Sequence, residues 1–489
     1  MYKVVVGGGS LLLARHAFAY LLSHGIPALV GFAAIAVYTR LLTEVEYGRY
    51  ALVFAIAAMI NAIVFEWLKV SLLRYYPMYQ GERPFFDTVK LCFLALVGVS
   101  AIAGLPLYFF IDGLGWVHVL LALILSWCQS WYQMNLNVIR SEFNPKLYGY
   151  LSFLRSVLAL AFGVVLILAG FEELGLLWGL VLAFVVTLAW PTVKKWEGAI
   201  RLKTFDVEIV KGFAGYGVPL ALTLLLGVVI HNSDRFIISA MIGVGANGTY
   251  SATYDLTEQT IFTLMLVINL AAFPIAVRTM EQKGEAEALK QVKENTGLLL
   301  LIALPAMIGL IILTPNVVGL MLGEGFREQA LLIMPLIAVG AFLKGIKLYA
   351  VDIIFHLHKR TSVQVLPVFL AALLNVILTI LLIPDFGLRG AAAATVAAYA
   401  AAILLSLFFM NIRIRDFPFP GKDFIKILCA SIVMGLVLWF MRAEVGLGWL
   451  LVQVVVGLVI YVILIWFVDA LGARNLIRKR LRSREGGEH

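Results

Sequence analysis

Apolar residues run through this chain in long stretches, each about as long as a helix that crosses a lipid bilayer. A bilayer core of about 30 Å requires about 20 consecutive, mostly apolar residues in a helix. Cutting the chain where charged residues gather leaves fourteen such stretches, and these with their short loops use up all 489 residues. The pattern therefore predicts an all-α polytopic membrane protein with about fourteen transmembrane helices and no soluble domain.

The predicted spans follow one another at short intervals along the whole chain. They are Ala17–Thr39, Tyr47–Leu68, Val89–Phe110, Trp116–Val138, Leu147–Ala169, Leu174–Trp190, Phe213–Ile238, Tyr250–Val277, Gly297–Leu320, Ala330–Phe355, Val363–Ile383, Gly390–Met410, Phe424–Met441 and Leu447–Val468.

The composition agrees with a membrane protein, because 62% of the residues are hydrophobic, 14% are charged and the mean hydropathy is +0.96. The net charge of +9 could indicate a nucleic-acid partner, but the distribution of the charge argues for membrane topology instead. Counted with the first turn of each adjoining span, the two tails and the even-numbered loops carry 29 Lys and Arg residues, and the odd-numbered loops carry 5. Because positive residues concentrate on the cytoplasmic side, we expect both termini to be cytoplasmic and no nucleic acid to bind.

Two joints of the chain, 200 residues apart, resemble each other. Gly48 and Tyr50 open the second span, and Gly248 and Tyr250 open the eighth. A repeat at equivalent topological positions is typical of duplicated transporters. It predicts one six-helix bundle in residues 1–200, a second in residues 201–415, two additional helices in residues 416–473 and a basic cytoplasmic tail in residues 474–489, which can lie on anionic lipid headgroups.

Several motifs in order along the chain resemble those of the polysaccharide, or oligosaccharide-lipid, flippases of the MATE-like superfamily. The first follows the first span and reads Arg40-Leu41-Leu42-Thr43-Glu44-Val45-Glu46-Tyr47-Gly48. The second combines Asp234-Arg235-Phe236-Ile237-Ile238 with Gly248-Thr249-Tyr250. The third is Leu374-Asn375-Val376 with Leu382-Ile383-Pro384-Asp385-Phe386-Gly387-Leu388-Arg389-Gly390-Ala391-Ala392.

This resemblance implies a flippase of the cytoplasmic, or inner, membrane and not an enzyme. Its cargo would be an undecaprenyl-diphosphate-linked oligosaccharide, such as the repeat unit of an O-antigen, a capsule or an exopolysaccharide. The resemblance also implies a V-shaped pair of bundles around a central hydrophilic cavity that opens alternately to each side. The partners would be the lipid-linked oligosaccharide, membrane lipids and other polysaccharide-assembly proteins.

Three other functions stay open at this point. A peptidoglycan-precursor flippase would differ only in its cargo. A MATE-type small-molecule antiporter is less favoured, because such antiporters often use a carboxylate in the first helix and Ala17–Thr39 contains none. A membrane glycosyltransferase or polymerase generally needs a sizeable outer loop, and the loops here are short.

Basic residues inside the predicted spans are the first candidates for substrate binding. Arg155 lies near the middle of the fifth span, and Lys344 and Lys347 lie three residues apart in the tenth. Charges at this depth are costly, so they usually face a cavity or a partner, and a cationic cavity would suit a diphosphate. The alternative is that these cations pair with intramembrane carboxylates such as Asp352, Asp255 or Glu258.

Other charged residues complete the set of candidates. Arg235 is adjacent to Asp234, and substrate contact and a structural ion pair are both open for these two. Arg40, directly after the first span, and Arg74, beyond the cytoplasmic end of the second, could also contact the cargo. The remaining charges predict ion pairs. Glu66 would pair with Lys69, three residues away on one helix. Asp352 would pair with one of the intramembrane cations.

In the first span, His24, Gly25 and Pro27 form a helix break at about the middle of the bilayer. Pro removes a backbone hydrogen bond and Gly loosens the turn, so we expect a kink there that serves as a gate. A static kink is the alternative. No motif predicts a metal site or a cofactor, and coupling to H⁺ or Na⁺ stays open.

Overall fold

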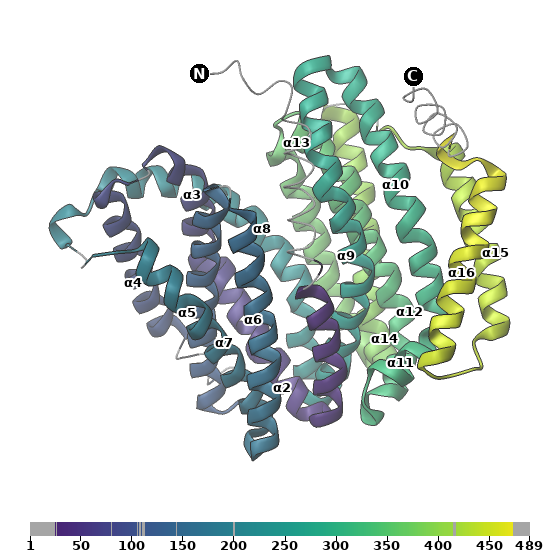
Figure 1. The fold of residues 1–489 in the computed structure, drawn as a ribbon, viewed down its shortest axis with the longest axis horizontal. Helices are drawn as coiled ribbons and strands as arrows, with labels where there is room; N and C mark the ends of the chain where they lie inside the picture. The colour runs from purple at the N-terminus through teal and green to yellow at the C-terminus, as the bar shows by residue number, and fades with distance from the viewer. Residues whose placement is uncertain are drawn as a thin grey trace, which may run out of the picture. The chain divides into compact units, whose positions relative to one another are not determined.

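The computed structural model describes residue 25 and residues 27–472, apart from residues 80, 105, 107–108, 110–112, 143, 199–200 and 414–416. The elements assigned in these residues are all helices (Figure 1). The α-helices are Pro27–Leu41, α2 (Glu44–Ile60), α3 (Glu66–Tyr75), α4 (Arg83–Gly104), α5 (Trp116–Ser141), α6 (Pro145–Leu166), α7 (Glu172–Lys195), α8 (Val207–Met241), α9 (Val244–Lys283), α10 (Glu285–Ile312), α11 (Thr314–Met321), α12 (Glu324–Ile346), α13 (Asp352–Leu357), α14 (Val365–Arg413), α15 (Gly421–Met441) and α16 (Leu447–Val468). The predicted all-α class is confirmed.

Ten helical stretches of the described residues are long and apolar enough to cross a membrane. Two of them, Pro145–Lys195 with 51 residues and Thr361–Ile412 with 52, would be about 77 Å long if straight, more than twice the thickness of a bilayer core. Each is instead a hairpin, as predicted from the sequence. With both hairpins counted twice, and with α5 and the shorter helix Pro27–Leu41, the stretches correspond to the fourteen predicted spans.

The hairpins reverse at glycines whose backbone is left-handed. Gly170, between α6 and α7, has φ 90°, and Gly387, within α14, has φ 55°. A Cβ built on Gly175 would lie 2.8 Å from the backbone N of Ile167, and one on Gly390 would lie 2.6 Å from the carbonyl carbon of Leu382. The two arms of each hairpin therefore pack with their backbones nearly in contact.

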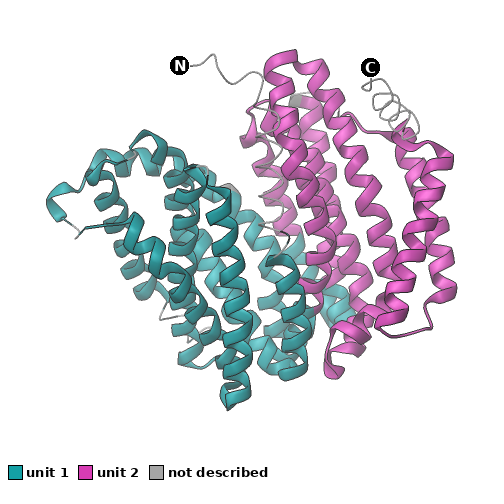
Figure 2. Cartoon of the chain, viewed as in Figure 1, with its two compact units in different colours: residues 1–252, 375–391 teal, residues 253–374, 392–489 magenta. Residues whose placement is uncertain are grey.

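The chain forms two compact units, shown in Figure 2. Unit 1 comprises residues 1–252 and 375–391, and unit 2 comprises residues 253–374 and 392–489. Unit 1 extends past the predicted boundary at residue 200 because α8 packs against α3, where the Ser71 hydroxyl donates to the Phe213 carbonyl at 2.9 Å. The two six-helix bundles and the two additional helices, as parts that act separately, stay a prediction.

Polar residues fix where several helices begin. Thr43 starts α2 with a capping box, in which its hydroxyl accepts from the Glu46 N–H at 3.3 Å and the Glu46 carboxylate accepts from the Thr43 N–H at 2.7 Å. Asn144 caps α6 just before Pro145, and Asp206 caps α8. These caps lie in short loops, so each long apolar helix has a defined first turn.

Loops of unit 1 gather at two ends according to their order in the chain. At one end, Glu173 at the start of α7 contacts both Arg49 near the start of α2 and His118 near the start of α5. Glu142, which follows α5, contacts Tyr76 and Lys195 at the other. Odd-numbered loops thus meet odd-numbered loops, and even meet even. This is the alternation on which the predicted topology depends.

The two similar joints of the sequence, at Gly48 and Gly248, contact each other in unit 1. A Cβ on Gly48 would clash with the carbonyl oxygen of Val244, and a Cβ on Gly248 would clash with that of Glu44 and lie 2.9 Å from the Gly48 nitrogen. Each glycine therefore packs on the residue four positions before the other, and the first turns of α2 and α9 cross within unit 1. The side chain of Asn247 donates to the Gly48 carbonyl at 3.2 Å across this crossing.

The last two helices form an antiparallel hairpin in unit 2. α15 packs against α10, and the Tyr461 hydroxyl of α16 donates to the Leu301 carbonyl at 2.7 Å. At one end Asn316 donates to the Gln453 side chain at 2.7 Å, both residues being fully buried. The remaining faces of α15 and α16 expose many large apolar side chains, as expected of helices that face lipid.

Candidate functional site

Arg155 lies on α6 among aromatic side chains of unit 1. Its guanidinium carbon is 5.8 Å from the ring centre of Tyr132 on α5 and 5.5 Å from that of Phe184 on α7. The two rings meet edge to face, with centres 5.4 Å apart. One guanidinium nitrogen donates to the Ser156 hydroxyl at 3.3 Å. A cation held against ring faces is attracted by them, but its charge is not neutralised.

Within the described part of the chain, no carboxylate lies within 4 Å of the Arg155 guanidinium. The neighbouring Tyr132 hydroxyl is buried near Arg155 and Ser152 but makes no hydrogen bond of good geometry there. A half-buried guanidinium and a buried phenol both have unused hydrogen-bonding capacity, which an anionic ligand could satisfy. Sequence reasoning selected Arg155 but missed Tyr132, since a tyrosine in an apolar helix carries no distinguishing signal.

The two candidate lysines of unit 2 are in a different situation. Lys347 is buried and donates to both carboxylate oxygens of Asp352 at 2.6 Å. Lys344 donates to the Glu258 carboxylate of α9 and lies 4.8 Å from the ring centre of Phe262. Both lysines thus have the carboxylate partners that the alternative interpretation named, and the ion pair of Asp352 is present as predicted.

A single wide helical turn explains the pairing of Lys347 with Asp352. Residues 347–351 form a π-helical turn between α12 and α13. In an α-helix, residues five apart point in quite different directions, but the wider π turn brings them toward one face. The two lysines, three apart in the sequence, consequently contact different elements instead of lining one cavity together.

A second π turn, Asn61–Phe65, precedes a polar cluster in unit 1. Lys69 is 2.5 Å from a Glu66 carboxylate oxygen, which confirms the predicted pair. The same ammonium donates to Asn61 and to Gln133, each at 2.5 Å. The sequence predicted the local pair but not the amides, one of which comes from α5.

Two further candidates lie at the surface of their helices. Arg74 is exposed, and its guanidinium carbon is 4.9 Å from the ring centre of Tyr216 on α8. Arg40 is exposed and donates to the Ala36 carbonyl of its own helix at 2.5 Å. These contacts involve other residues than those around Arg155.

Asp234 and Arg235 are both buried on α8. The Asp234 carboxylate accepts a hydrogen bond from the Tyr250 hydroxyl at 2.8 Å and another from the Thr379 hydroxyl at 3.1 Å. Next to it, the Ser233 hydroxyl donates to the Asn375 side chain at 3.0 Å. These contacts connect the second and third motifs, because residues of α8, α9 and α14 meet there.

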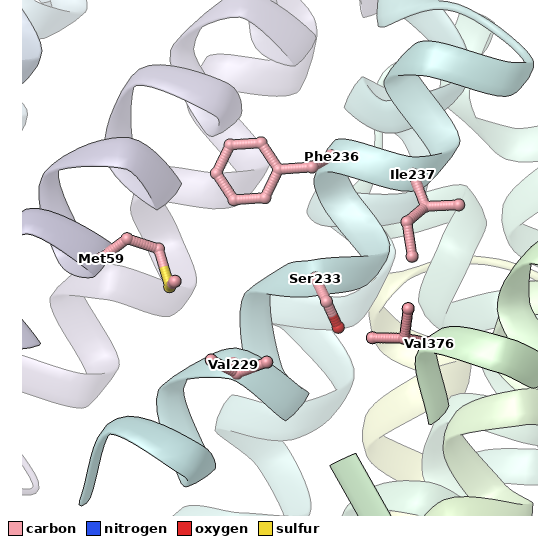
Figure 3. A pocket seen from close by; sticks show the side chains of 6 residues that line it. All are labelled: Met59, Val229, Ser233, Phe236, Ile237 and Val376. Carbon is pink, nitrogen blue, oxygen red and sulfur yellow. The ribbon is translucent and has the colours of Figure 1, made fainter. Parts of the chain in front are cut away.

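A small cavity lies beside this cluster in unit 1 (Figure 3). Its volume is about 210 Å³, and Ser233 supplies the only hydroxyl of its lining residues. The residues that line it are Met59, Val229, Ser233, Phe236, Ile237 and Val376. None of the predicted basic residues lines this cavity, so it is distinct from the expected cationic cavity.

Of the three predicted gate residues, Gly25 and Pro27 are helical, and His24 lies outside the described residues. Gly25 has no atom within 4 Å of the position of a Cβ. The role of the three residues as a gate stays a prediction.

Long apolar helices in two compact units define a polytopic membrane protein. The family model described as "Polysaccharide biosynthesis protein" matches residues 37–331. The chain belongs to this polysaccharide biosynthesis family, as the sequence motifs predicted.

Relatives of known name agree with this assignment. A protein of Haloferax volcanii named "Probable low-salt glycan biosynthesis flippase" is 22% identical over 343 residues, which cover 70% of each chain. The lipid II flippase MurJ of Thermosipho africanus is 28% identical over 191 residues, which cover 38% of each chain. These relatives are flippases and not catalytic enzymes, in agreement with the predicted class.

Solved structures show the same fold. The lipid II flippase MurJ in its inward closed conformation has a TM-score of 0.72 at 16% identity, and the match covers 96% of this chain and all of that one. An inward-facing multidrug resistance MATE transporter has a TM-score of 0.60 at 16% identity, over 81% of this chain and 94% of that one. The predicted MATE-like fold is confirmed.

Proposed function

We propose that this protein flips an undecaprenyl-diphosphate-linked oligosaccharide across the cytoplasmic membrane by alternating access. The cargo would be the repeat unit of an O-antigen, a capsule or an exopolysaccharide. Family membership and the named flippases support transport of a glycan lipid, and the charge distribution of the loops supports cytoplasmic termini. No covalent step is needed, because translocation only moves the diphosphate and the sugars from one face of the membrane to the other.

The observation that carries the proposal is the state of Arg155. Its guanidinium contacts two aromatic rings and, within the described residues, no carboxylate. A guanidinium presents several N–H donors in a planar fork that matches phosphate oxygens. The Tyr132 hydroxyl near it makes no hydrogen bond of good geometry among the described residues and can donate to the same phosphate. Arg155 would thus hold the diphosphate during passage.

The paired lysines have a secondary place in this proposal. A diphosphate that displaced Asp352 from Lys347, or Glu258 from Lys344, would leave a carboxylate without its cation, and the exchange would gain little. We therefore assign the first contact with the diphosphate to Arg155. Arg235, Arg74 and Arg40 stay candidates for later contacts along the path, with Gly25 and Pro27 as the gate of the first helix.

Coupling to H⁺ or Na⁺ is part of the same proposal, with Asp234 as the acid that carries it. Ionisable residues inside transmembrane helices frequently mark ion pathways. Asp234 is buried, and hydroxyls of two other helices donate to its carboxylate, so a change in its charge would be felt by all three helices. Membrane lipids and other polysaccharide-assembly proteins are the expected partners.

The test is a transport assay with the purified protein in sealed vesicles. Labelled undecaprenyl-diphosphate oligosaccharide, lipid II and a cationic drug are supplied separately, and their movement across the bilayer is measured. We expect the oligosaccharide lipid to move and to keep its length. Movement of lipid II alone would identify a peptidoglycan-precursor flippase, expulsion of the drug alone an antiporter, and elongation of the sugar a polymerase.

A pair of arginine variants links the transport to the site. Arg155→Gln should lower the flipping rate at least about tenfold, which corresponds to about 1.4 kcal/mol of lost stabilisation. Arg442→Gln is the matched control, because Arg442 also lies over an aromatic ring, that of Trp439, but at the end of α15. Equal rates for the two variants would contradict the role of Arg155.

A further inference from the structure

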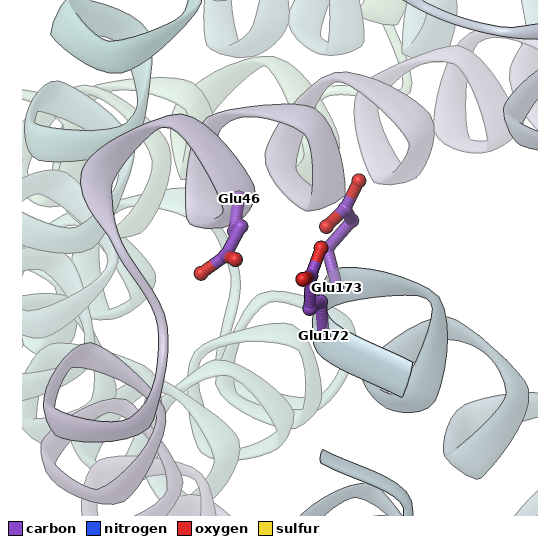
Figure 4. A group of neighbouring side chains, drawn as sticks. All are labelled: Glu46, Glu172 and Glu173. Carbon is purple, nitrogen blue, oxygen red and sulfur yellow. The ribbon is translucent and has the colours of Figure 1, made fainter. Parts of the chain in front are cut away.

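Three carboxylates meet at one end of unit 1, away from Arg155 and from Asp234. Glu46 belongs to the first turn of α2, and Glu172 and Glu173 are the first two residues of α7. One carboxylate oxygen from each residue lies within 4.8 Å of one from each of the other two. Figure 4 shows the three side chains. Glu172 is exposed, Glu46 is half-buried and Glu173 is 3% exposed.

The hydrogen bonds from Arg49 and His118 use only one of the two carboxylate oxygens of Glu173. Its Oε1 accepts from Arg49 Nη1 at 3.1 Å and lies 3.1 Å from His118 Nε2. His118 Nδ1 accepts from the Gly115 N–H at 3.1 Å, so this nitrogen carries no hydrogen. The imidazole is therefore neutral, and its Nε2–H donates to Glu173. Both donors thus contact the same oxygen.

The other oxygen of Glu173, Oε2, is buried and has no hydrogen-bond partner in the described residues. Burial would raise the pKa of this carboxyl, but the hydrogen bonds from His118, from the Glu173 backbone N–H and from Arg49 outweigh burial and hold the pKa below its usual value. Glu173 lies in the turn between two spans. A charged, buried carboxylate oxygen without a donor is unusual in folded proteins and indicates a missing partner.

Charge points to the kind of partner. Among the described residues, the three carboxylates have one cationic partner, Arg49, which pairs with Glu173, and the imidazole of His118 is neutral, so the group carries two negative charges in excess. Carboxylate oxygens are the ligands of hard divalent cations, and Ca²⁺ accepts six to eight oxygens in flexible geometry. With each oxygen about 2.3–2.6 Å from Ca²⁺, two ligands can be up to about 5 Å apart, which accommodates the observed 4.8 Å limit.

We propose that Glu46, Glu172 and Glu173 bind a divalent cation, Ca²⁺ in preference to Mg²⁺, with water completing its coordination. The bound ion would supply the missing partner of Glu173 and would join the first turn of α2 to the turn between α6 and α7. In the predicted topology these loops face outward, where calcium sites of low affinity are common. The site is separate from the cargo, so the proposal does not depend on which lipid is flipped.

A simpler explanation accounts for part of the cluster. Acidic residues in the first turn of a helix stabilise it through the helix dipole, and Glu46 also completes the capping box of α2. Glu172 and Glu173 stand at the equivalent place in α7. This explanation requires no ion, but it leaves Glu173 Oε2 without a donor, and it predicts no saturable uptake of cations.

The experiment measures Ca²⁺ and Mg²⁺ binding by the full-length protein, purified in an uncharged detergent and treated with a chelator. Isothermal titration gives stoichiometry and affinity, and the midpoint of thermal unfolding is followed against Ca²⁺ concentration. We expect one Ca²⁺ per chain with a dissociation constant of about 0.1–1 mM, weaker binding of Mg²⁺, and a midpoint that rises with Ca²⁺.

Two substitutions and a control locate the ion. Glu172→Gln should weaken Ca²⁺ binding at least about tenfold, and adding Glu46→Gln should abolish it, since both changes remove a charge and keep the size of the side chain. The amide oxygen of Gln at position 46 can still accept from the Thr43 N–H. Glu44→Gln is the matched control, because Glu44 lies in the same first turn of α2 but outside the cluster, and it should bind Ca²⁺ like the unmodified protein.

Two results would overturn the proposal. One is the absence of saturable Ca²⁺ binding by the unmodified protein up to about 10 mM, tenfold above the weakest sites of this kind. The other is binding that is unchanged in Glu172→Gln, a variant whose altered side chain is exposed and therefore should not impair folding. Neither result would affect the transport assay, so the two proposals fail independently.

Discussion

Arg155 in unit 1 and Lys347 in unit 2 are both cations in long apolar helices, and the sequence presents them alike. Their surroundings differ in one respect. Lys347 is 3% exposed and donates to both oxygens of Asp352, whereas Arg155 is half-buried against Tyr132 and Phe184. A charge inside a membrane helix can therefore belong to an ion pair or lie against aromatic rings without a carboxylate among the described residues, and its neighbours decide which.

The largest effect is expected at Lys347. Lys347→Met would leave the Asp352 carboxylate buried without its cation, and breaking a buried pair in this way costs about 3–5 kcal/mol of unfolding free energy. The midpoint of thermal unfolding and the amount of protein in the membrane should both fall. Adding Asp352→Asn should restore most of the stability, because the uncompensated charge is then removed.

Normal stability together with a loss of transport in Lys347→Met would contradict this distinction between Lys347 and Arg155. Lys347 would then contact the cargo as Arg155 does, and both units would contribute to binding the diphosphate. The double variant distinguishes the cases, since Asp352→Asn can rescue a folding defect but cannot replace a lost contact with the substrate.

An intermediate effect is expected at Lys344. Its side chain and that of Glu258 keep 13% and 14% of their exposure, so water partly compensates the loss of either partner. Lys344→Met should cost about 1.5–3 kcal/mol, the range for a hydrogen bond to a charged group. Denaturant unfolding of the single variants and of Lys344→Met with Glu258→Gln gives the coupling energy. A coupling energy near zero would show that the two side chains do not support each other.

The smallest effect on stability is expected at Arg155. Arg155→Met removes only attraction to two rings and should change the unfolding free energy by less than about 1 kcal/mol. Transport should nevertheless fall strongly, and Arg155→Lys should recover part of it, because an ammonium replaces a fork that can bind two phosphate oxygens. Thermal unfolding and flipping are measured on the same preparations. A large loss of stability would instead show that Arg155 has a structural partner other than a carboxylate of the described residues.

The helices and their order could be predicted from the sequence because hydrophobic length is a strong and local signal. The hairpins at Gly170 and Gly387 fall where the apolar pattern is interrupted, and the Glu66 and Lys69 pair follows from their spacing on one helix. These features depend on residues that are close in the chain.

The site was less predictable, since its contacts depend on local geometry or on distant residues. Lys347 reaches Asp352 only because residues 347–351 form a π turn, which no sequence pattern announces. Similarly, Glu173 meets Glu46 from 127 positions away, and the pattern of apolar stretches records neither the meeting nor the orientation of their carboxylates. Sequence reasoning found the charged residues but could not assign their partners.

The crossing of α2 and α9 at Gly48 and Gly248 has a consequence for how the chain can change over generations. The two glycines occupy equivalent positions in a repeated joint, and each fills the space that a side chain on the other helix would need. A larger residue at either position would push the same two backbones apart. The two positions, 200 residues apart in the sequence, are therefore under the same steric constraint. A duplicated gene is usually free to let its copies diverge. Here each of the two similar joints packs against the other, so a substitution in one joint constrains what the other can tolerate.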